Sequence, residues 1–360
     1  MFEISGVARR AMGSNERLLR SLESYRQGIE AELKEAIGGS PPAFYDMLRY
    51  HLGWQDEQGR PCRGKSGKLV RPLLCLFSCQ AAGGDAVRIM PAAAAVELIH
   101  NFSLIHDDIQ DSSYKRHHRP ALWKVWGESQ AINAGDVMFA LAFSVLLKLR
   151  NNGITESKIM GAVRFLSGAG RELCEGQYLD IAYQSRSEVT IKDYLDMIAR
   201  KTAALMAASA AIGGCLAVDD QGVVKALYGF GEELGLAYQV QDDLRGIWGT
   251  EEETGKPGKE DISQMKKTFP VVYAFEHSGN DDRRKLKELY SREVIPDEEF
   301  ALVVEILERS GAPEQGQKLL QQYHRQALAK LKTSGLDLAG QSLLTGMAGF
   351  LVMGKWTKER

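Results

Sequence analysis

Two acidic runs inside apolar helical segments constrain this chain more than any other feature. The first run is Asp107-Asp108-Ile109-Gln110-Asp111, and the second is Asp242-Asp243. A buried carboxylate without a partner is costly, so both runs need something that neutralises them. Divalent cations shared between two facing helices would do this. Because hard cations take oxygen ligands, and because Lys and Arg lie near both runs, the pattern suggests magnesium holding a phosphorylated substrate.

The first run has a defined geometry if it is helical. Residues four apart share a helix face, so Asp107 and Asp111 project together, whereas Asp108 points about 100° away. Asp107 and Asp111 can therefore ligate the same ions, and Asp108 either supports them or reaches a second ion. The same stripe extends back to Ser103 and His100. The alternative is a solvated acidic helix end, which the apolar residues on both sides disfavour.

Several cations near these runs are suited to diphosphate oxygens. Arg can bind a phosphate group through two N–H groups at once, and Lys acts as a point charge. A single Lys or Arg is more often a surface charge, so only the whole set of cations indicates a diphosphate site. The candidates are Lys68, Arg71, Arg116, Lys201 and Lys256.

Periodicity and composition predict one helical domain over residues 1–360. Helical spacing of apolar residues dominates, and no stretch has the composition of an interdomain linker. Besides an apolar stretch over 69–82, helices are expected over 14–36, 89–110, 128–150, 155–183, 190–217 and 220–245, with more after 268. The most lid-like loop is 249–267, which mixes glycine and proline with charged residues.

Charge and cysteine usage narrow the class of protein further. The net charge of -2, without a basic stripe, argues against a nucleic-acid partner. The longest uncharged stretch, 203–218, is shorter than the roughly 20 residues of a membrane span and predicts a buried helix. Five cysteines without a CxxC pair are typical of reduced thiols, so we expect a cytoplasmic protein without a membrane span.

The order of the motifs resembles the trans-type polyprenyl diphosphate synthases, over a core of about residues 67–270. The matching motifs are Gly67-Lys68-x-x-Arg71-Pro72, His100, His106-Asp107-Asp108-x-x-Asp111, Arg116, Pro120, Gly135-Asp136, Gly176-Gln177-x-x-Asp180, Lys201-Thr202, Gln239-x-x-Asp242-Asp243 and Gly255-Lys256. The resemblance implies an all-α, isoprenoid-synthase-type helical bundle around a deep central cavity, usually in a homodimer.

The same resemblance implies two substrates and three magnesium ions. The ions would bind Asp107, Asp111 and Asp242 and hold an allylic diphosphate with help from Arg116, Lys201 and Lys256. Isopentenyl diphosphate would bind Lys68, Arg71, His100 and the residue at position 117. Oxygens near Lys201, Thr202 and Gln239 would face the developing carbocation. The allylic C–O bond ionises, the isopentenyl double bond attacks the cation, and a proton is lost.

Three positions depart from the family pattern. The usual Arg-Arg-Gly is Arg116-His117-His118 here, so a permanent cation becomes titratable, and we expect affinity for isopentenyl diphosphate to weaken as pH rises through neutrality. An alternative is that His117 binds as a neutral donor. The third Asp of the second motif is Gly246, a loss that activity should survive. Met265 replaces the glycine before the last lysine pair.

Product length depends, in the family, on the residues just before the first Asp. Here they are Phe102 and Ser103, without an insertion in the acidic run. An aromatic floor there predicts a C15–C20 product, with C20 favoured, as in a farnesyl or geranylgeranyl diphosphate synthase. Two alternatives remain: a class I terpene cyclase, which needs no isopentenyl diphosphate site, and a non-catalytic subunit of a heteromeric synthase, which would have lost metal ligands.

Overall fold

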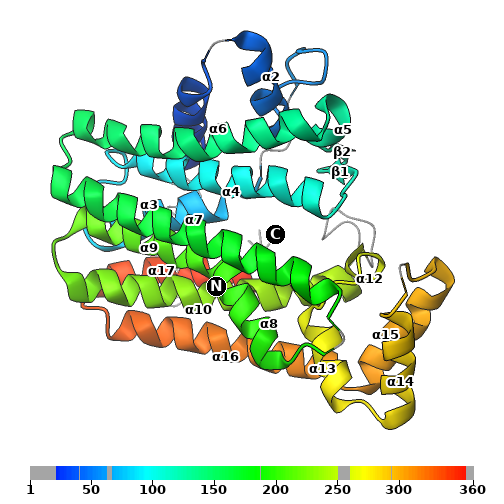
Figure 1. The fold of residues 1–360 in the computed structure, drawn as a ribbon. Helices are drawn as coiled ribbons and strands as arrows, with labels where there is room; N and C mark the ends of the chain where they lie inside the picture. The colour runs from blue at the N-terminus through cyan, green and yellow to red at the C-terminus, as the bar shows by residue number, and fades with distance from the viewer. Residues whose placement is uncertain are drawn as a thin grey trace, which may run out of the picture.

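The structure is a computed structural model that describes residues 22–39, 41–62, 67–186, 188–249, 260–292 and 294–353. Within these ranges the chain is almost entirely helical, and its long helices run side by side in layers (Figure 1). The all-α prediction is therefore confirmed. The extent of the single domain stays a prediction.

The elements follow one another in a regular series of helices with one small hairpin. In chain order they are α2 (Pro42–His51), α3 (Val70–Ala81), α4 (Met90–Gln110), β1 (Lys115–Arg116), β2 (Arg119–Pro120), α5 (Leu122–Trp126), α6 (Glu128–Leu147), η1 (Lys148–Asn152), α7 (Glu156–Gln184), α8 (Ile191–Ile198), η2 (Ala199–Ala203), α9 (Ala204–Ala217), α10 (Gln221–Trp248), α12 (Glu260–Ser263), α13 (Phe269–His277), α14 (Asn280–Leu289), η3 (Asp297–Glu299), α15 (Phe300–Arg309), α16 (Ala312–Lys332) and α17 (Leu338–Met353).

The expected helices agree with these bounds to within a few residues for α4, α7 and α10. Residues 22–36 are helical, as expected, whereas 14–21 lie outside the described residues. Strands β1 and β2 were not predicted, because two residues each are too few to show an alternating pattern.

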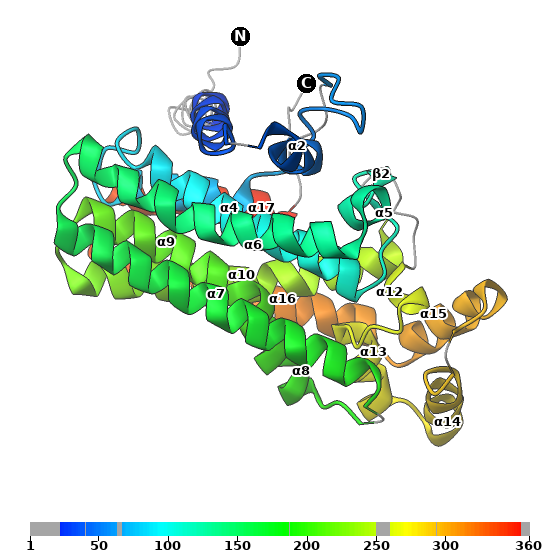
Figure 2. The same cartoon turned by 45° about the horizontal axis from the view of Figure 1, so that its top comes forward.

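Helix α9 forms the centre of the bundle. It packs against α3, α7 and α10, and all its residues except Cys215 and Ala217 are buried. Its Ala- and Gly-rich sequence lets these neighbours approach closely, since small side chains keep the helix axes near one another. The prediction of a buried helix over 203–218 is confirmed. Helices α4 and α6 form the adjoining layer, and α2 and the helix over 22–36 cover it (Figure 2).

The α6 layer has one property that the sequence prediction missed. The stretch Glu128–Asn152 is long and apolar enough, by length and composition alone, to cross a bilayer, and 39% of its apolar window is buried. Helices of a soluble core pass the same test. Apolar side chains remain exposed on its outer face, including Ile132 and Leu147.

A second, smaller hydrophobic cluster lies beyond the end of α10. It is formed by residues of α12 to α15, with Leu286 and Ile306 fully buried at its centre. This cluster fixes α12 close to the C-terminal end of α10. The end of α10 is where the second acidic run lies.

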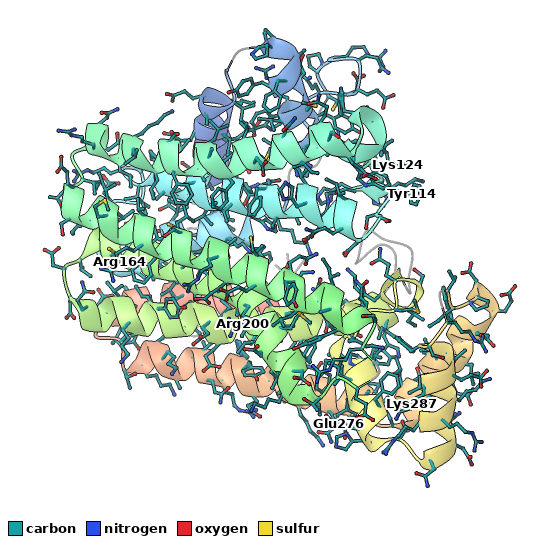
Figure 3. All side chains as sticks on the ribbon, in the orientation of Figure 1. Tyr114, Lys124, Arg164, Arg200, Glu276 and Lys287 are labelled. Carbon is teal, nitrogen blue, oxygen red and sulfur yellow. The ribbon has the colours of Figure 1, made fainter. Side chains whose placement is uncertain are left out.

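A surface pocket of about 500 Å³ is lined by Lys158, Arg164 and Cys215 among others, and no residue of the acidic runs lines it. Arg164 lies at the opposite end of the bundle from Tyr114, which follows the first acidic run (Figure 3). The deep central cavity implied by the resemblance therefore stays a prediction.

Helix α4 buries one carboxylate in its middle, at Glu97. The side chain is 5% exposed, and Asn101 Nδ2 donates to its Oε1 at 2.9 Å while Oε2 has no partner. Burial raises the pKa of Glu97 to about 7, although Asn101 and Arg71 oppose the shift. Because the folded-state pKa lies above the unfolded one, the folded protein loses stability as pH rises from about 4.5 to 7.

We therefore expect Glu97→Gln to stabilise the protein at pH 8, by on the order of 2 kcal/mol, and to have little effect near pH 4. Urea unfolding at both pH values measures the difference. An equal effect of the substitution at pH 4 and pH 8 would contradict the assignment.

Candidate active site

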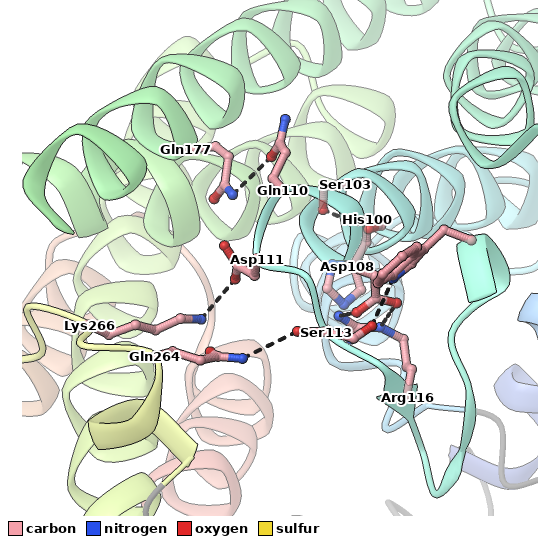
Figure 4. Close-up of polar contacts among 11 residues, drawn as sticks. His100, Ser103, Asp108, Gln110, Asp111, Ser113, Arg116, Gln177, Gln264 and Lys266 are labelled. Atoms are coloured by element: carbon pink, nitrogen blue, oxygen red, sulfur yellow. Dashed lines mark hydrogen bonds and ion pairs between the residues drawn. The ribbon is translucent and has the colours of Figure 1, made fainter. Parts of the chain in front are cut away.

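The first acidic run closes α4. Asp111 is the C-terminal cap, and its N–H donates to the Asp107 carbonyl at 2.8 Å, so the expected one-turn spacing is kept. Asp108 points away from this pair. It is 2% exposed and binds Arg116 through both oxygens, at 2.8 Å from Nε and from NH2 (Figure 4). Asp108 could either support Asp107 and Asp111 or reach a second ion, and the structure favours the supporting role.

Asp111 meets a lysine from a distant part of the chain. Lys266 Nζ lies 3.0 Å from Asp111 Oδ2, while Oδ1 is buried without a partner (Figure 4). Burial alone would lower the pKa of Lys266, but Asp111 and Asp261 outweigh it and raise the pKa. Sequence reasoning did not name Lys266 as a site residue. The signals available were its place in the last lysine pair of the family pattern and at the end of the lid-like segment 249–267.

Lys201 enters the same cluster from a π-helical turn. The turn, η2, joins α8 to α9, and such turns re-aim side chains. A Cβ on Gly176 would lie 2.2 Å from the Lys201 backbone nitrogen, so only glycine lets α7 approach this closely. Lys201 Nζ then reaches Asp180 Oδ2 at 2.6 Å. Burial would raise the pKa of Asp180, but Lys201 and Lys266 outweigh it and lower the pKa.

Asp107 also belongs to this cluster. Burial raises its pKa, which Lys201 opposes and Asp111 reinforces. The cluster therefore joins the carboxylates Asp107, Asp111 and Asp180 with the ammonium groups Lys201 and Lys266. Sequence reasoning quoted Asp180 in a motif but gave it no role.

The second acidic run has one buried and one exposed carboxylate. Asp243 accepts hydrogen bonds from Tyr194 Oη at 2.7 Å, Gln239 Nε2 at 2.7 Å and the Phe269 N–H at 2.9 Å. Burial raises its pKa to about 7 despite these donors. Asp242, one residue earlier, is exposed. Asp242 is therefore the carboxylate of this run that is accessible to a ligand.

A hydrogen-bonded chain ties this run to η2. Thr202 Oγ1 donates to Gln239 Oε1 at 2.6 Å, and Gln239 Nε2 donates to Asp243 Oδ1 at 2.7 Å. With its amide group held from both sides, Gln239 has a fixed orientation. The structure thus joins Thr202 to Gln239, with Lys201 next to Thr202 in the chain; the resemblance implied that these three positions face the carbocation, and that role stays a prediction.

No ready-made metal cage is present in the described ranges. There, no three Asp, Glu, His or Cys side chains are placed to share one ion. The ligands predicted on α4 and α10 are thus not assembled around a common point. The buried, unpartnered Oδ1 of Asp111 is the acceptor that fits a cation.

A second group of basic side chains lies farther back along α4, around His100. Arg71 NH1 lies 3.2 Å from His100 Nε2, and Arg71 Nε is buried without a partner. Burial, together with Arg71 and Arg116, lowers the pKa of His100 well below its usual range. The neutral imidazole nitrogen therefore accepts from the guanidinium. Lys68 is exposed at the start of this segment.

His51 of α2 adds to this group, and sequence reasoning missed it. Burial, reinforced by the charges of Arg116 and His117, lowers the pKa of His51 to about 3. No motif surrounds His51, so only the fold reveals it. Arg71, Arg116 and His117, together with the neutral imidazoles of His51 and His100, form the basic group of the site. Its positive charge comes from the guanidinium groups and favours an anionic ligand.

The hairpin formed by β1 and β2 places Arg116 next to Asp108. Lys115 pairs with Pro120 and Arg116 with Arg119, which leaves His117 and His118 as a two-residue loop. Both have positive φ, 50° and 63°, as a type I′ turn requires. The glycine that the family carries at position 118 suits that conformation, whereas a histidine is strained in it.

The remaining predicted residues are less directly placed. Ser103 Oγ donates to the His100 carbonyl at 2.7 Å, within its own helix. Phe102 is 7% exposed and packs on Phe139 of α6, with ring centroids 5.1 Å apart. Lys256 and most of the lid-like segment lie outside the described residues.

Comparison with known proteins decides the family. The family model for polyprenyl synthetases matches residues 59–307. This chain belongs to the polyprenyl synthetase family. As a member it is a prenyltransferase, and its fold is the helical fold of isoprenyl synthases.

Several relatives of this polyprenyl synthetase have known names. The (2E,6E)-farnesyl diphosphate synthase of Mycobacterium tuberculosis is 42% identical over 79% of this chain and 78% of its own length. The geranylgeranyl diphosphate synthase of the same organism is 40% identical over 75% of each chain. A solved polyprenyl synthetase from Streptomyces coelicolor has a TM-score of 0.86 and 37% identity, covering 92% of this chain and 99% of its own.

The strained hairpin of this polyprenyl synthetase yields a stability prediction. We expect His118→Gly to raise the free energy of unfolding by up to about 1 kcal/mol, because glycine adopts positive φ without a clash. His118→Ala is the matched control, since it removes the ring but keeps the Cβ. Thermal unfolding compares them, and equal melting temperatures for the two variants would count against strain at this position.

Proposed function

We propose that this prenyltransferase condenses isopentenyl diphosphate with an allylic diphosphate to give a C15–C20 polyprenyl diphosphate, with C20 favoured, and pyrophosphate. The proposal rests on two separate groups of charged and polar side chains along α4. One combines Asp107, Asp111 and Asp180 with two lysines, and the other is the basic group around Arg71 and His100. Two anionic substrates would thus have a site each, one at the C-terminal end of α4 and one about two turns earlier, around His100.

The acidic group fits magnesium in its donor chemistry. Its ligands are carboxylate oxygens, which hard cations prefer, and the free Asp111 Oδ1 is a buried acceptor that needs a partner. We propose that Asp107, Asp111 and Asp242 hold three magnesium ions. When bound, the ions would neutralise the charge that grows on the departing pyrophosphate.

The lysines would share that task from the protein side. Lys201 and Lys266 already carry positive charge into the acidic group, and each can turn from its carboxylate to a phosphate oxygen. The Thr202 hydroxyl and the Gln239 amide lie beside Lys201, and their oxygens would stabilise the allylic cation. The basic group would orient isopentenyl diphosphate, with its double bond directed at that cation.

A product assay tests the proposal. Purified protein, magnesium and isopentenyl diphosphate are incubated with dimethylallyl, geranyl or farnesyl diphosphate in separate tubes, and the products are sized by mass spectrometry. A discrete C15 or C20 diphosphate is expected. Hydrocarbon or alcohol from an allylic diphosphate alone would favour a terpene cyclase, and no turnover at all would favour a non-catalytic subunit.

Product length should depend on the aromatic row of Phe102, Phe139 and Phe143, which links α4 to α6. Phe102→Ala should lengthen the product by at least one isoprene unit, because it removes the ring nearest the acidic run. Phe143→Ala is the control, since its ring meets Phe139 and lies farther along the row. If Phe102→Ala leaves the product profile unchanged, the floor of the cavity lies on another helix.

The affinity for isopentenyl diphosphate should depend on pH through position 117. An ordinary histidine is charged only below about pH 6.5, so the KM for isopentenyl diphosphate should rise between pH 6 and 8.5. His117→Arg should abolish the rise, because arginine keeps its charge. A wild-type KM that stays flat over this range would mean that His117 binds as a neutral donor.

We further propose a cytoplasmic homodimer that associates through the outer face of α6 and α7. Large apolar side chains are exposed there, which monomers seldom tolerate as a group. They are Ile132, Leu147, Met160, Tyr178 and Ile181. Sedimentation should give twice the mass of the chain, and Ile132→Asp with Tyr178→Asp should shift the protein to monomer; a monomeric wild type would exclude the dimer.

All five cysteines are free, which agrees with a reducing compartment.

A further inference from the structure

Arg119, on β2, directs its side chain at the end of α2. Its NH2 group donates to the Tyr50 carbonyl at 2.5 Å, and its NH1 group donates to the Gln55 carbonyl at 3.2 Å. The central carbon of the guanidinium lies 4.5 Å from the centre of the Tyr50 ring. Because this planar group meets two carbonyls and an aromatic ring at once, its orientation is fixed. Arg119 therefore binds the main chain of its own protein.

Tyr50 holds the next residue of β2. Its hydroxyl donates to the Pro120 carbonyl at 2.8 Å, and its ring packs edge-on against Trp126 of α5, with the ring centroids 4.9 Å apart. Tyr50 is 3% exposed, so little water reaches this hydrogen bond to replace it. Both residues of β2, Arg119 and Pro120, are thus bound to the same residue of α2.

The hairpin depends on this support because it is short and strained. Each strand has two residues, and a hairpin of that length is not stable alone. His117 and His118, at its tip, both have positive φ, which adds strain. Arg116 pairs with Arg119 across the hairpin, so the contacts that hold β2 also hold β1. The position of Arg116 and His117 therefore depends on the contacts between β2 and α2.

The end of α2 is itself fixed to α4. His51, the last residue of α2, forms a hydrogen bond with the side chain of Asn101, which is 6% exposed within α4. The hairpin is thus held to α4 at two points. One is the direct pair of Arg116 and Asp108, and the other runs through α2 and depends on Arg119.

We propose that Arg119 is a positioning residue for the binding of isopentenyl diphosphate, which holds the hairpin against α2 and so places His117 and Arg116 in the basic group. Arg119 acts through the hairpin and not through its own charge, because its NH1 and NH2 groups both bind main-chain carbonyls. None of the motifs that indicate the family contains Arg119. This inference rests on the proposed function, which assigns the basic group to isopentenyl diphosphate.

Steady-state kinetics of Arg119→Gln test the proposal. We expect the KM for isopentenyl diphosphate to rise about tenfold, as for the loss of one well-placed charged contact, whereas kcat and the KM for the allylic diphosphate change less than about twofold. Arg88→Gln is the matched control and should behave as the wild type does. Arg88 also donates to two main-chain carbonyls, those of Asn152 and Gly153, but it lies before the start of α4. Equal rises of both KM values in Arg119→Gln would overturn the proposal.

Arg119→Lys separates positioning from charge. Lysine keeps the positive charge but has no planar fork for two carbonyls, so we expect its KM for isopentenyl diphosphate to lie near that of Arg119→Gln. A wild-type KM in Arg119→Lys would overturn the proposal. Because Arg119 acts through the hairpin, Arg119→Gln should also raise the KM less when it is combined with His117→Ala. A full tenfold rise in that background would contradict the positioning role.

Hydrogen exchange of the ligand-free protein separates this inference from the proposed function. The amides of residues 114–121 report on the hairpin, whose base is closed by a hydrogen bond of 2.9 Å from the Ala121 N–H to the Tyr114 carbonyl. We expect these amides to exchange faster in Arg119→Gln than in the wild type or in Arg88→Gln. Unchanged exchange would overturn the positioning role even if the enzyme makes the expected product. Faster exchange, together with a wild type that does not use isopentenyl diphosphate, would instead refute the proposed function and with it the role of Arg119 in binding.

Discussion

Neutralisation of buried carboxylates is the constraint on which the rest of the site depends. Helices α4 and α10 each carry acidic residues near their C-terminal ends, and the bundle takes these residues partly out of water. The contacts that stabilise the carboxylate differ from one position to the next. Asp108 binds one arginine through both oxygens, Asp243 accepts three hydrogen bonds, and Asp111 forms an ion pair with a lysine. Each solution fixes a neighbouring segment, and together these segments form the walls of the site.

These solutions also separate structural carboxylates from reactive ones. Asp108 and Asp243 have their oxygens engaged within the protein, so they act as supports. Asp111 is paired only through a mobile lysine side chain, and Asp242 is exposed. A ligand can therefore displace the lysine from Asp111 without breaking the fold. Neighbouring residues in one run thus serve different purposes, because successive helical positions face different surroundings.

The sequence was sufficient for the fold class, whereas the roles assigned to the site residues stay predictions. Long periodic segments predicted α4, α7 and α10, and helical spacing predicted that Asp108 would point away from Asp107 and Asp111. Lys266 and His51 were missed, because their roles arise from tertiary contacts. Lys266 follows the turn that ends α12, and His51 ends α2, which packs on α5 and α6. No local pattern encodes such contacts.

We propose that the two acidic runs bind one diphosphate group, and anomalous diffraction can test this. Crystals would be grown with manganese in place of magnesium and with an unreactive allylic thiolodiphosphate. We expect anomalous peaks between the carboxylates of α4 and Asp242, with Lys266 moved from Asp111 onto a phosphate oxygen. Manganese bound elsewhere, with the Lys266–Asp111 pair intact, would contradict it.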